Sequence, residues 1–305
     1  MNTIPILDPM VHMPLDSDIF EATAHHRRTV FLLATPGGDR HELKMMLQTP
    51  LWDSLRISPS FTIRDRDPDV KFVQLFPTQR QDLPATASKT SWWYSDAHLA
   101  WFDNGFFCSQ VPNIAVLIQA VIDVVLKEKT DHGIPFANMV IGGIGQAGVV
   151  AMGVVLACGV EGIRYISVDA GVPLLTRMQP LLQLIKDQNA NSQLAMFSLA
   201  IFFRANLGLT VPNQHLGNDT TTKMKGGLIS MLFHPSIGTN LDKDSRIRAQ
   251  QSLKVAGYNV RLGIGQTPRH SSYYGDNVNT LYNSIVDSLK WMDLDDSNLD
   301  PLGGG

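Results

Sequence analysis

The segment 138–158 combines a short apolar strand, a turn of small residues and an apolar helix. The turn has the sequence GGIGQAG, and Gly145 lies at its centre. A nucleophile elbow, G-x-S-x-G, has the same order of elements, and its strained turn lifts a serine above a sheet. Glycine has no side-chain oxygen. The spacing therefore predicts the geometry of a site for covalent acyl transfer without the nucleophile that performs it.

The same glycines also fit a dinucleotide-binding turn. Gly143, Gly145 and Gly148 satisfy G-x-G-x-x-G after a strand, and Asp169 follows at about the distance of the ribose-binding acid, roughly 20 residues. This strand lies in the middle of the chain, however, and the interpretation explains none of the other motifs. We favour the elbow and expect no cofactor.

The elements that must position this turn alternate along the chain. Apolar runs predict strands at 29–34, 70–76, 138–141, 163–168, 228–233 and 258–264. Helices are predicted at 111–129, 245–256 and 278–292, besides the helix that follows the turn and ends near Cys158. Strands alternating with helices predict the α/β class, with a mostly parallel, doubly wound sheet in a single domain, 1–305.

The alternation is interrupted between residues 172 and 226. Two apolar helical segments, 178–186 and 194–206, are joined there by polar linkers. Ligands of open α/β sheets bind beyond the carboxyl ends of the strands, so this insertion is expected to form a helical lid over the site. Two other roles stay open: packing against the sheet edge, and burial against a second copy of the chain in a homodimer.

Composition excludes several classes of partner. The chain of 305 residues is 44% hydrophobic and 17% charged, with a net charge of -3 and no dense stripe of Lys and Arg. This balance argues against nucleic acid and favours an apolar small molecule. No apolar stretch is long enough to span a bilayer, and no signal peptide is recognised, so we expect a cytoplasmic protein. The spacing of the nine histidines and two cysteines indicates no metal site.

Further motifs resemble one family and occur in its order. The run GGIGQAG resembles the G-G-F-S-Q-G-G elbow of acyl-protein thioesterases and related carboxylesterases. TPGGD at 35–39 takes the place of the family's L-H-G-x-G-D oxyanion loop, although Thr35 and Pro36 replace the His-Gly pair. WFD at 101–103 matches the family's W-F-D. The similarity covers nearly the whole chain except the insertion.

This resemblance implies an α/β-hydrolase fold and assigns roles to individual residues. The C-terminal segment GIGQTPRHSSYY aligns His270 with the triad histidine. The backbone N–H groups of Gln146 and Gly37 correspond to the oxyanion donors. Gly145 is then the nucleophile position, without its serine.

The acid of the triad is also missing from its expected place. The family has H-G-x-x-D-x-x-V-P after the penultimate strand, and matching His234 to the motif's histidine puts the acid at Gly238. Asp242 or Asp244 could replace it by a shift of the loop. Both acids also lie just before a predicted helix, where a carboxylate stabilises the N-terminus without a catalytic role.

Three functions remain open. The first is a non-hydrolytic cyclase, isomerase or lyase, with His270 as acid/base, that acts on an apolar small molecule such as a specialised metabolite. The second is a carboxylesterase or acyl thioesterase whose nucleophile is replaced by Gly145. The third is a pseudoenzyme that binds a ligand or partner without turnover. Four aromatic residues are candidate walls of the pocket or members of the core: Trp92, Trp93, Trp101 and Tyr273.

Overall fold

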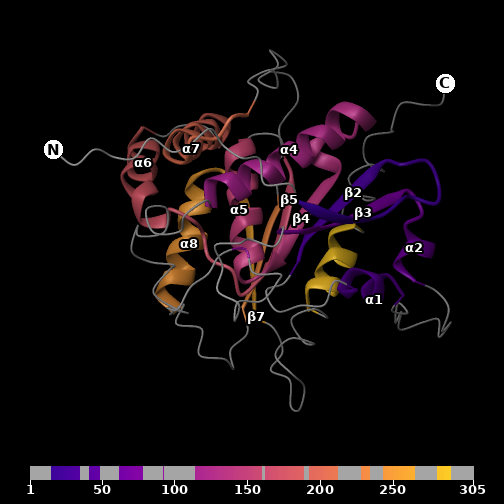
Figure 1. The fold of residues 1–305 in the computed structure, drawn as a ribbon. Helices are drawn as coiled ribbons and strands as arrows, with labels where there is room; N and C mark the ends of the chain where they lie inside the picture. Colours follow the sequence, from indigo (N-terminus) through magenta and orange to yellow (C-terminus); the bar gives the residue numbers. More distant parts are fainter. Residues whose placement is uncertain are drawn as a thin grey trace, which may run out of the picture.

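A computed structural model gives the arrangement of most of the chain as one sheet with helices on both faces (Figure 1). It describes residues 15–34, 41–48, 62–77, 92, 114–159, 162–188, 192–211, 228–233, 243–264 and 280–289.

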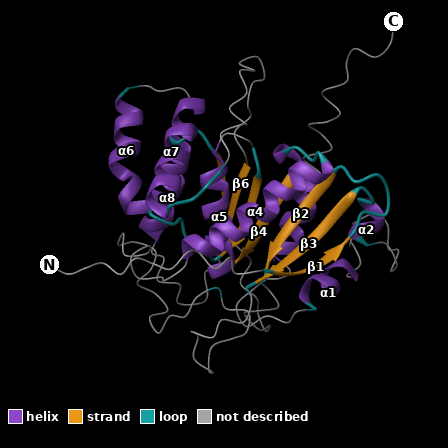
Figure 2. Ribbon diagram, turned by 45° about the horizontal axis from the view of Figure 1, so that its top comes forward, coloured by secondary structure: helices purple, strands orange, loops and turns teal. Residues whose placement is uncertain are grey.

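The sheet has the strand order β1-β3-β2-β4-β5-β6-β7, and β1 alone runs antiparallel to its neighbour (Figure 2). The strands are β1 (Asp16–Phe20), β2 (Arg28–Leu33), β3 (Val70–Phe76), β4 (Met139–Ile144), β5 (Arg164–Val168), β6 (Leu228–Phe233) and β7 (Asn259–Ile264). Because β2 to β7 are parallel, their carboxyl ends share one edge of the sheet, where open α/β sheets bind ligands.

Alternate residues of the central strands point into two separate cores. In β2, Phe31 and Leu33 pack into one core, while Val30 and Leu32 pack into the other. The first core is covered by α4 (Ile114–His132), α5 (Gln146–Cys158), α6 (Leu175–Asp187), α7 (Ser192–Leu207) and α8 (Lys243–Val255). The second is covered by α1 (Glu42–Gln48), α2 (Ile63–Arg66) and the helix 280–289. The sheet is therefore doubly wound.

The predicted strands are confirmed, and the predicted helices that lie in the described residues are found within a few residues of their expected bounds. One strand is longer than expected: the strand predicted at 138–141 continues to Ile144, because Gly142 and Gly143 stay in register with β5. β1 was not predicted. Its sequence, DSDIF, is exposed at three of five positions, so it lacks the apolar pattern of a core strand.

The two helices of the insertion join the helical layer on the first core. Arg204 of α7 donates from Nε to the carbonyl of Ala157 in α5, at 2.7 Å. Gln179 of α6 donates from Nε2 to the hydroxyl of Ser252 in α8, at 2.8 Å. These contacts hold α6 and α7 against neighbouring helices. Their role as a lid stays a prediction.

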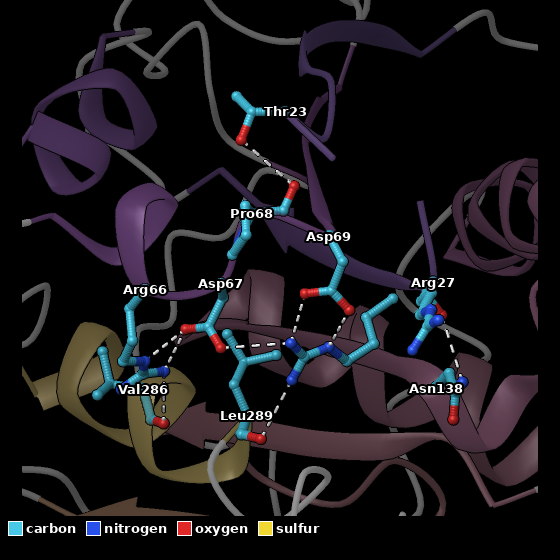
Figure 3. Close-up of polar contacts among 10 residues, drawn as sticks. Thr23, Arg27, Arg66, Asp67, Pro68, Asp69, Asn138, Val286 and Leu289 are labelled. Carbon is cyan, nitrogen blue, oxygen red and sulfur yellow. Dashed lines mark hydrogen bonds and ion pairs between the residues drawn. The ribbon is translucent and has the colours of Figure 1, made fainter. Parts of the chain in front are cut away.

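Buried charges fix the amino-terminal edge of the sheet. Arg28 at the start of β2 binds Asp69 through Nη2 at 2.6 Å and Asp67 at 3.4 Å (Figure 3). Its Nη1 also donates to the carbonyl of Leu289, which ties the helix 280–289 to the sheet. Arg66 shares Asp67 and donates to a carbonyl of the same helix. Asp67 is 2% exposed, so its charge depends on these partners.

We expect Asp67→Asn to lower the free energy of unfolding by about 3 kcal/mol, because it leaves buried cations without full compensation. The value lies at the lower end of the usual range since Asp69 still pairs with Arg28. Urea unfolding followed by circular dichroism measures it. The matched control is Asp131→Asn on the exposed side of α4, which should change stability little. Equal stability of the two variants would contradict a structural role for Asp67.

A second polar cluster lies at the same edge. Glu128 of α4 is buried and accepts from Lys71 at 2.9 Å and from Thr29 at 2.8 Å. His26 lies 3.2 Å from the same carboxylate, and burial lowers its pKa below the ordinary value of 6.5 despite the opposing charge of Glu128. The folded protein therefore favours neutral His26.

Since the pKa of His26 is lower in the folded state, the unfolded chain binds more protons as the pH falls below about 6.5. The neutral histidine's contribution to stability is thus complete above that pH and is lost progressively below it. When the pH is lowered from 7.5 to 5.5, the melting temperature of His26→Gln should fall less than that of the parent. His25→Gln, at an exposed neighbouring position, should behave like the parent.

Candidate functional site

The turn between β4 and α5 consists of Gly145 alone. β4 ends at Ile144, and α5 begins at Gln146 with Gly145 as its N-cap. Gly145 has φ 57° and ψ -120°, a conformation that L side chains rarely adopt. Its N–H donates to the carbonyl of Val168 at 2.9 Å, and its own carbonyl accepts from Val149 at 3.1 Å. This is the sharp strand-to-helix turn that a nucleophile elbow requires.

Small residues on both sides let the strand and the helix approach closely. A Cβ on Gly143 would lie 2.7 Å from Cβ of Ala147 and 2.9 Å from its carbonyl carbon. A Cβ on Gly148 would lie 2.5 Å from Cβ of Ala170. At Gly145, by contrast, no atom of the described residues lies within 4 Å of an added Cβ. The turn thus excludes side chains at its flanks and leaves space for one at its centre.

The helix behind the turn is held rigidly. Every residue of α5 except Gln146 is buried, and the helix packs on β4, α4 and α7. Tyr165 of β5 donates its hydroxyl to the carbonyl of Gly148 at 2.8 Å, and burial raises the pKa of this phenol. The N-terminus of α5 carries the partial positive charge of the helix dipole, which favours a negative group beside Gly145.

Trp92 is the one aromatic candidate that the structure describes, and it lies next to the turn. Its backbone N–H donates to Oε1 of Gln146 at 3.1 Å, and its indole N–H donates to the carbonyl of Ala34 at 2.9 Å. Its side chain is 0% exposed and belongs to the first core. Trp92 was a candidate for either the pocket wall or the core, and this burial favours the core. Gln146 is the first residue of α5, and its role as an oxyanion donor stays a prediction.

The remaining predicted site residues lie outside the described part of the chain. These are His270, Gly238, Asp242, Gly37, Trp93, Trp101 and Tyr273. Five of them occur in sequence segments that directly follow parallel strands: 35–40 follows β2, 234–242 follows β6 and 265–279 follows β7. Because these strands are parallel to β4, their carboxyl ends lie at the same edge as Gly145.

One buried acid at this edge was not predicted as a member of the hydrolase site. Asp169 directly follows β5, is 5% exposed and has φ 51°, which is unusual for a residue other than glycine. Sequence reasoning considered Asp169 only as the acid of a dinucleotide site. The signal that could have identified it is its place directly after an apolar strand of a parallel sheet.

The topology argues against the dinucleotide interpretation. In a Rossmann domain the glycine-rich turn follows the first strand of the unit, whereas β4 is the third of the parallel strands in chain order. Among the described residues, no cluster of three or more His, Cys, Asp or Glu could hold a metal ion. No helix in this part of the chain is long and apolar enough to cross a membrane.

A groove of about 500 Å³ lies between α6 and α8, and none of its lining residues belongs to the turn. Polar and basic side chains form much of its wall, and Leu182 and Val255 complete it.

Comparison with known proteins identifies the fold. No protein-family profile matches the sequence, and no curated protein sequence matches it. A crystal structure of esterase PE8 matches with a TM-score of 0.56 and 13% identity over 90% of this chain and 99% of the other. The Bacillus cereus carboxylesterase matches with a TM-score of 0.50 and 8% identity over 92% and 93%. The acyl-protein thioesterase 2 of Zea mays matches at 0.48 and 12% identity over 90% and 99%, a score too low to support a conclusion.

The matches to esterase PE8 and to the Bacillus cereus carboxylesterase, together with the mostly parallel sheet, establish that the chain has an α/β-hydrolase fold. The fold that the sequence predicted is confirmed. At such low sequence identity the similarity establishes the fold alone, and the function must be argued from the residues of the site.

Alanine substitutions test the packing of the turn. Gly143→Ala should cost about 3 kcal/mol, because its Cβ meets backbone atoms that cannot move away. Gly145→Ala should cost only about 1 kcal/mol, since it has space and bears backbone strain alone. Gly133→Ala is the matched control, with φ +69° and nothing within 4 Å. In chemical unfolding, Gly145→Ala and Gly133→Ala should show similar losses in the free energy of unfolding. If Gly145→Ala lost as much stability as Gly143→Ala, the Cβ position of residue 145 would not be open.

Proposed function

We propose that the chain has a site of the carboxylesterase and acyl-thioesterase type in which Gly145 stands at the nucleophile position. The site binds an apolar acyl ester or thioester and does not form an acyl-enzyme. The observation that carries this proposal is the elbow backbone of Gly145, combined with the space that the described residues leave around its Cβ position. The esterase and carboxylesterase among the structural matches support the same class of ligand.

Each part of the turn has a role in this proposal. The N–H of Gln146, at the N-terminus of α5, stabilises negative charge on the ligand's carbonyl oxygen, together with the N–H of Gly37. His270 supplies the base. Without a side-chain oxygen at residue 145, no covalent bond to the acyl carbon forms, and the ligand is held in the geometry of the first step only.

A second candidate is a non-hydrolytic cyclase, isomerase or lyase that uses the same pocket. The observation that favours it is the absence of any side-chain oxygen at Gly145, while an acid/base and amide donors would suffice for such steps. The described residues leave space for a side chain at Gly145, and this favours the first proposal, because a site adapted to other chemistry has no need to keep that position open.

Gly145→Ser tests the proposed function directly. We expect the serine variant to hydrolyse p-nitrophenyl acetate and longer acyl esters at least about 100-fold faster than Gly145→Ala, because only serine supplies a nucleophile for the base. A fluorophosphonate should add to the serine variant in intact-mass measurements and to neither the parent nor the alanine variant.

Gly145→Ala is the matched control, since it imposes the same backbone strain without an oxygen. A folded serine variant that neither hydrolyses esters nor reacts with the fluorophosphonate would overturn the proposal. The parent would then be tested for cyclisation and isomerisation, with His270→Ala as the control. Turnover that requires His270 would establish the second candidate, and ligand binding without turnover would indicate a pseudoenzyme.

A further inference from the structure

We propose that Trp92 is a positioning residue of this site, because it connects the first residue of α5 to the end of β2. The inference rests on the proposed function, in which the N–H of Gln146 stabilises negative charge on the ligand. Trp92 has two N–H groups, one in the backbone and one in the indole ring. The first donates to Gln146 and the second to Ala34. These two hydrogen bonds form an anchor between α5 and β2.

The anchor lies where the ladder between β2 and β4 has ended. The last pair in register between these two strands is Leu32 with Gly142. Beyond this pair β4 continues beside β5, and the N–H of Gly145 donates to the carbonyl of Val168. Backbone hydrogen bonds therefore hold the elbow to β5. On the side of β2, the hydrogen bonds of Trp92 provide a connection past the end of the ladder.

Ala34 is a fixed point of attachment for this anchor. It is buried and directly follows β2, and its N–H donates to the carbonyl of Leu75 in β3 at 2.9 Å. Its own carbonyl accepts from the indole N–H of Trp92, also at 2.9 Å. Both backbone polar groups of Ala34 are thus bound, so the indole is held to a part of the sheet that cannot shift easily.

The side chain of Trp92 is suited to transmit this fixed position. It is the largest of the fully buried side chains that the structure describes. An indole has two side-chain torsions, and close packing in a core holds it in one rotamer. Its N–H can only donate, and a buried donor without an acceptor costs free energy, so the ring stays where it reaches the carbonyl of Ala34.

At its other end the anchor acts on Gln146. The side-chain Oε1 of this residue accepts from the backbone N–H of Trp92 at 3.1 Å. Gln146 is the one residue of α5 that is not buried, so packing constrains it less than the rest of the helix. A group that takes part in chemistry must be held within about 0.5 Å of its productive position. The hydrogen bond to Trp92 therefore restricts the residue that carries the proposed donor.

Hydrogen exchange of the Trp92 indole tests the anchor without requiring turnover. The indole signal is assigned by triple-resonance NMR, and its loss is followed in D₂O. Gln146→Met removes the acceptor of the backbone N–H of Trp92 and keeps a side chain of similar length. We expect the indole proton to exchange at least about 10-fold faster in this variant, because both hydrogen bonds hold the same residue.

Gln119→Met is the matched control for this measurement. The Oε1 of Gln119 also accepts a backbone N–H, that of Thr210 at 2.7 Å, but it does so on α4. The same substitution there removes the same kind of contact and should leave the exchange of the Trp92 indole unchanged. Equal exchange in Gln146→Met and the parent would overturn the anchor.

A kinetic test in the Gly145→Ser background examines the positioning role. Trp92→Phe removes the indole N–H and keeps an aromatic ring. It should lower kcat about 10-fold and leave KM within about twofold, because a displaced donor weakens stabilisation of the transition state more than binding. Arg204→Met is the matched control, since it removes a side-chain donor to the carbonyl of Ala157 near the opposite end of α5. It should change neither constant.

The outcomes separate this inference from the proposed function. An active serine variant whose kcat is unaffected by Trp92→Phe, or falls equally in Arg204→Met, overturns the positioning role. An inactive serine variant with faster indole exchange in Gln146→Met rejects the esterase-type function and keeps the anchor. If Trp92→Phe does not fold, Gln146→Met replaces it in the kinetic test, because it breaks the anchor from the other side and keeps the backbone N–H of residue 146.

Discussion

The close approach of β4 and α5 is the constraint on which the rest of the structure depends. Gly143 and Gly148 leave no space for a Cβ, so the central strand and the central helix meet at a single turning residue. This contact allows α5 to be buried along almost its whole length. The helices α4 and α7 pack on α5, and all three helices contribute residues to the first core. Replacing either flanking glycine would therefore disturb both the turn and the centre of the fold.

The two edges of the sheet have different physical roles. At the amino-terminal edge, the buried pairs Arg28–Asp67 and Lys71–Glu128 satisfy charges that cannot reach water. Arg28 of β2 also binds a carbonyl of the helix 280–289, and Lys71 of β3 binds Glu128 of α4. Polar contacts therefore join these four elements at this edge. The carboxyl-terminal edge contains the helix dipole of α5 and the strained residue Asp169. Buried ionic contacts are thus found at one edge, and the proposed binding site lies at the other.

The sequence predicted the fold well because its signals were local. Continuous apolar runs marked the buried strands, and helical spacing marked the helices between them. β1 escaped detection because an exposed antiparallel edge strand needs no apolar run. The turn at Gly145 was predicted from spacing alone. The position of Asp169 beside this turn was not predicted, because the register of β4 with β5 brings together residues 24 positions apart and cannot be deduced from either segment alone.

The glycines of the turn differ in whether close packing requires them. Gly143 and Gly148 are required by packing, so they would be retained whether or not the site performs chemistry. Gly145 is not required in that way, because the described residues leave space for a side chain there. A serine held at φ 57° would store about 1–3 kcal/mol of backbone strain, and glycine removes that cost. In the proposed site, the elbow therefore keeps its backbone geometry without a serine and with less strain, so its geometry does not depend on a nucleophile at residue 145.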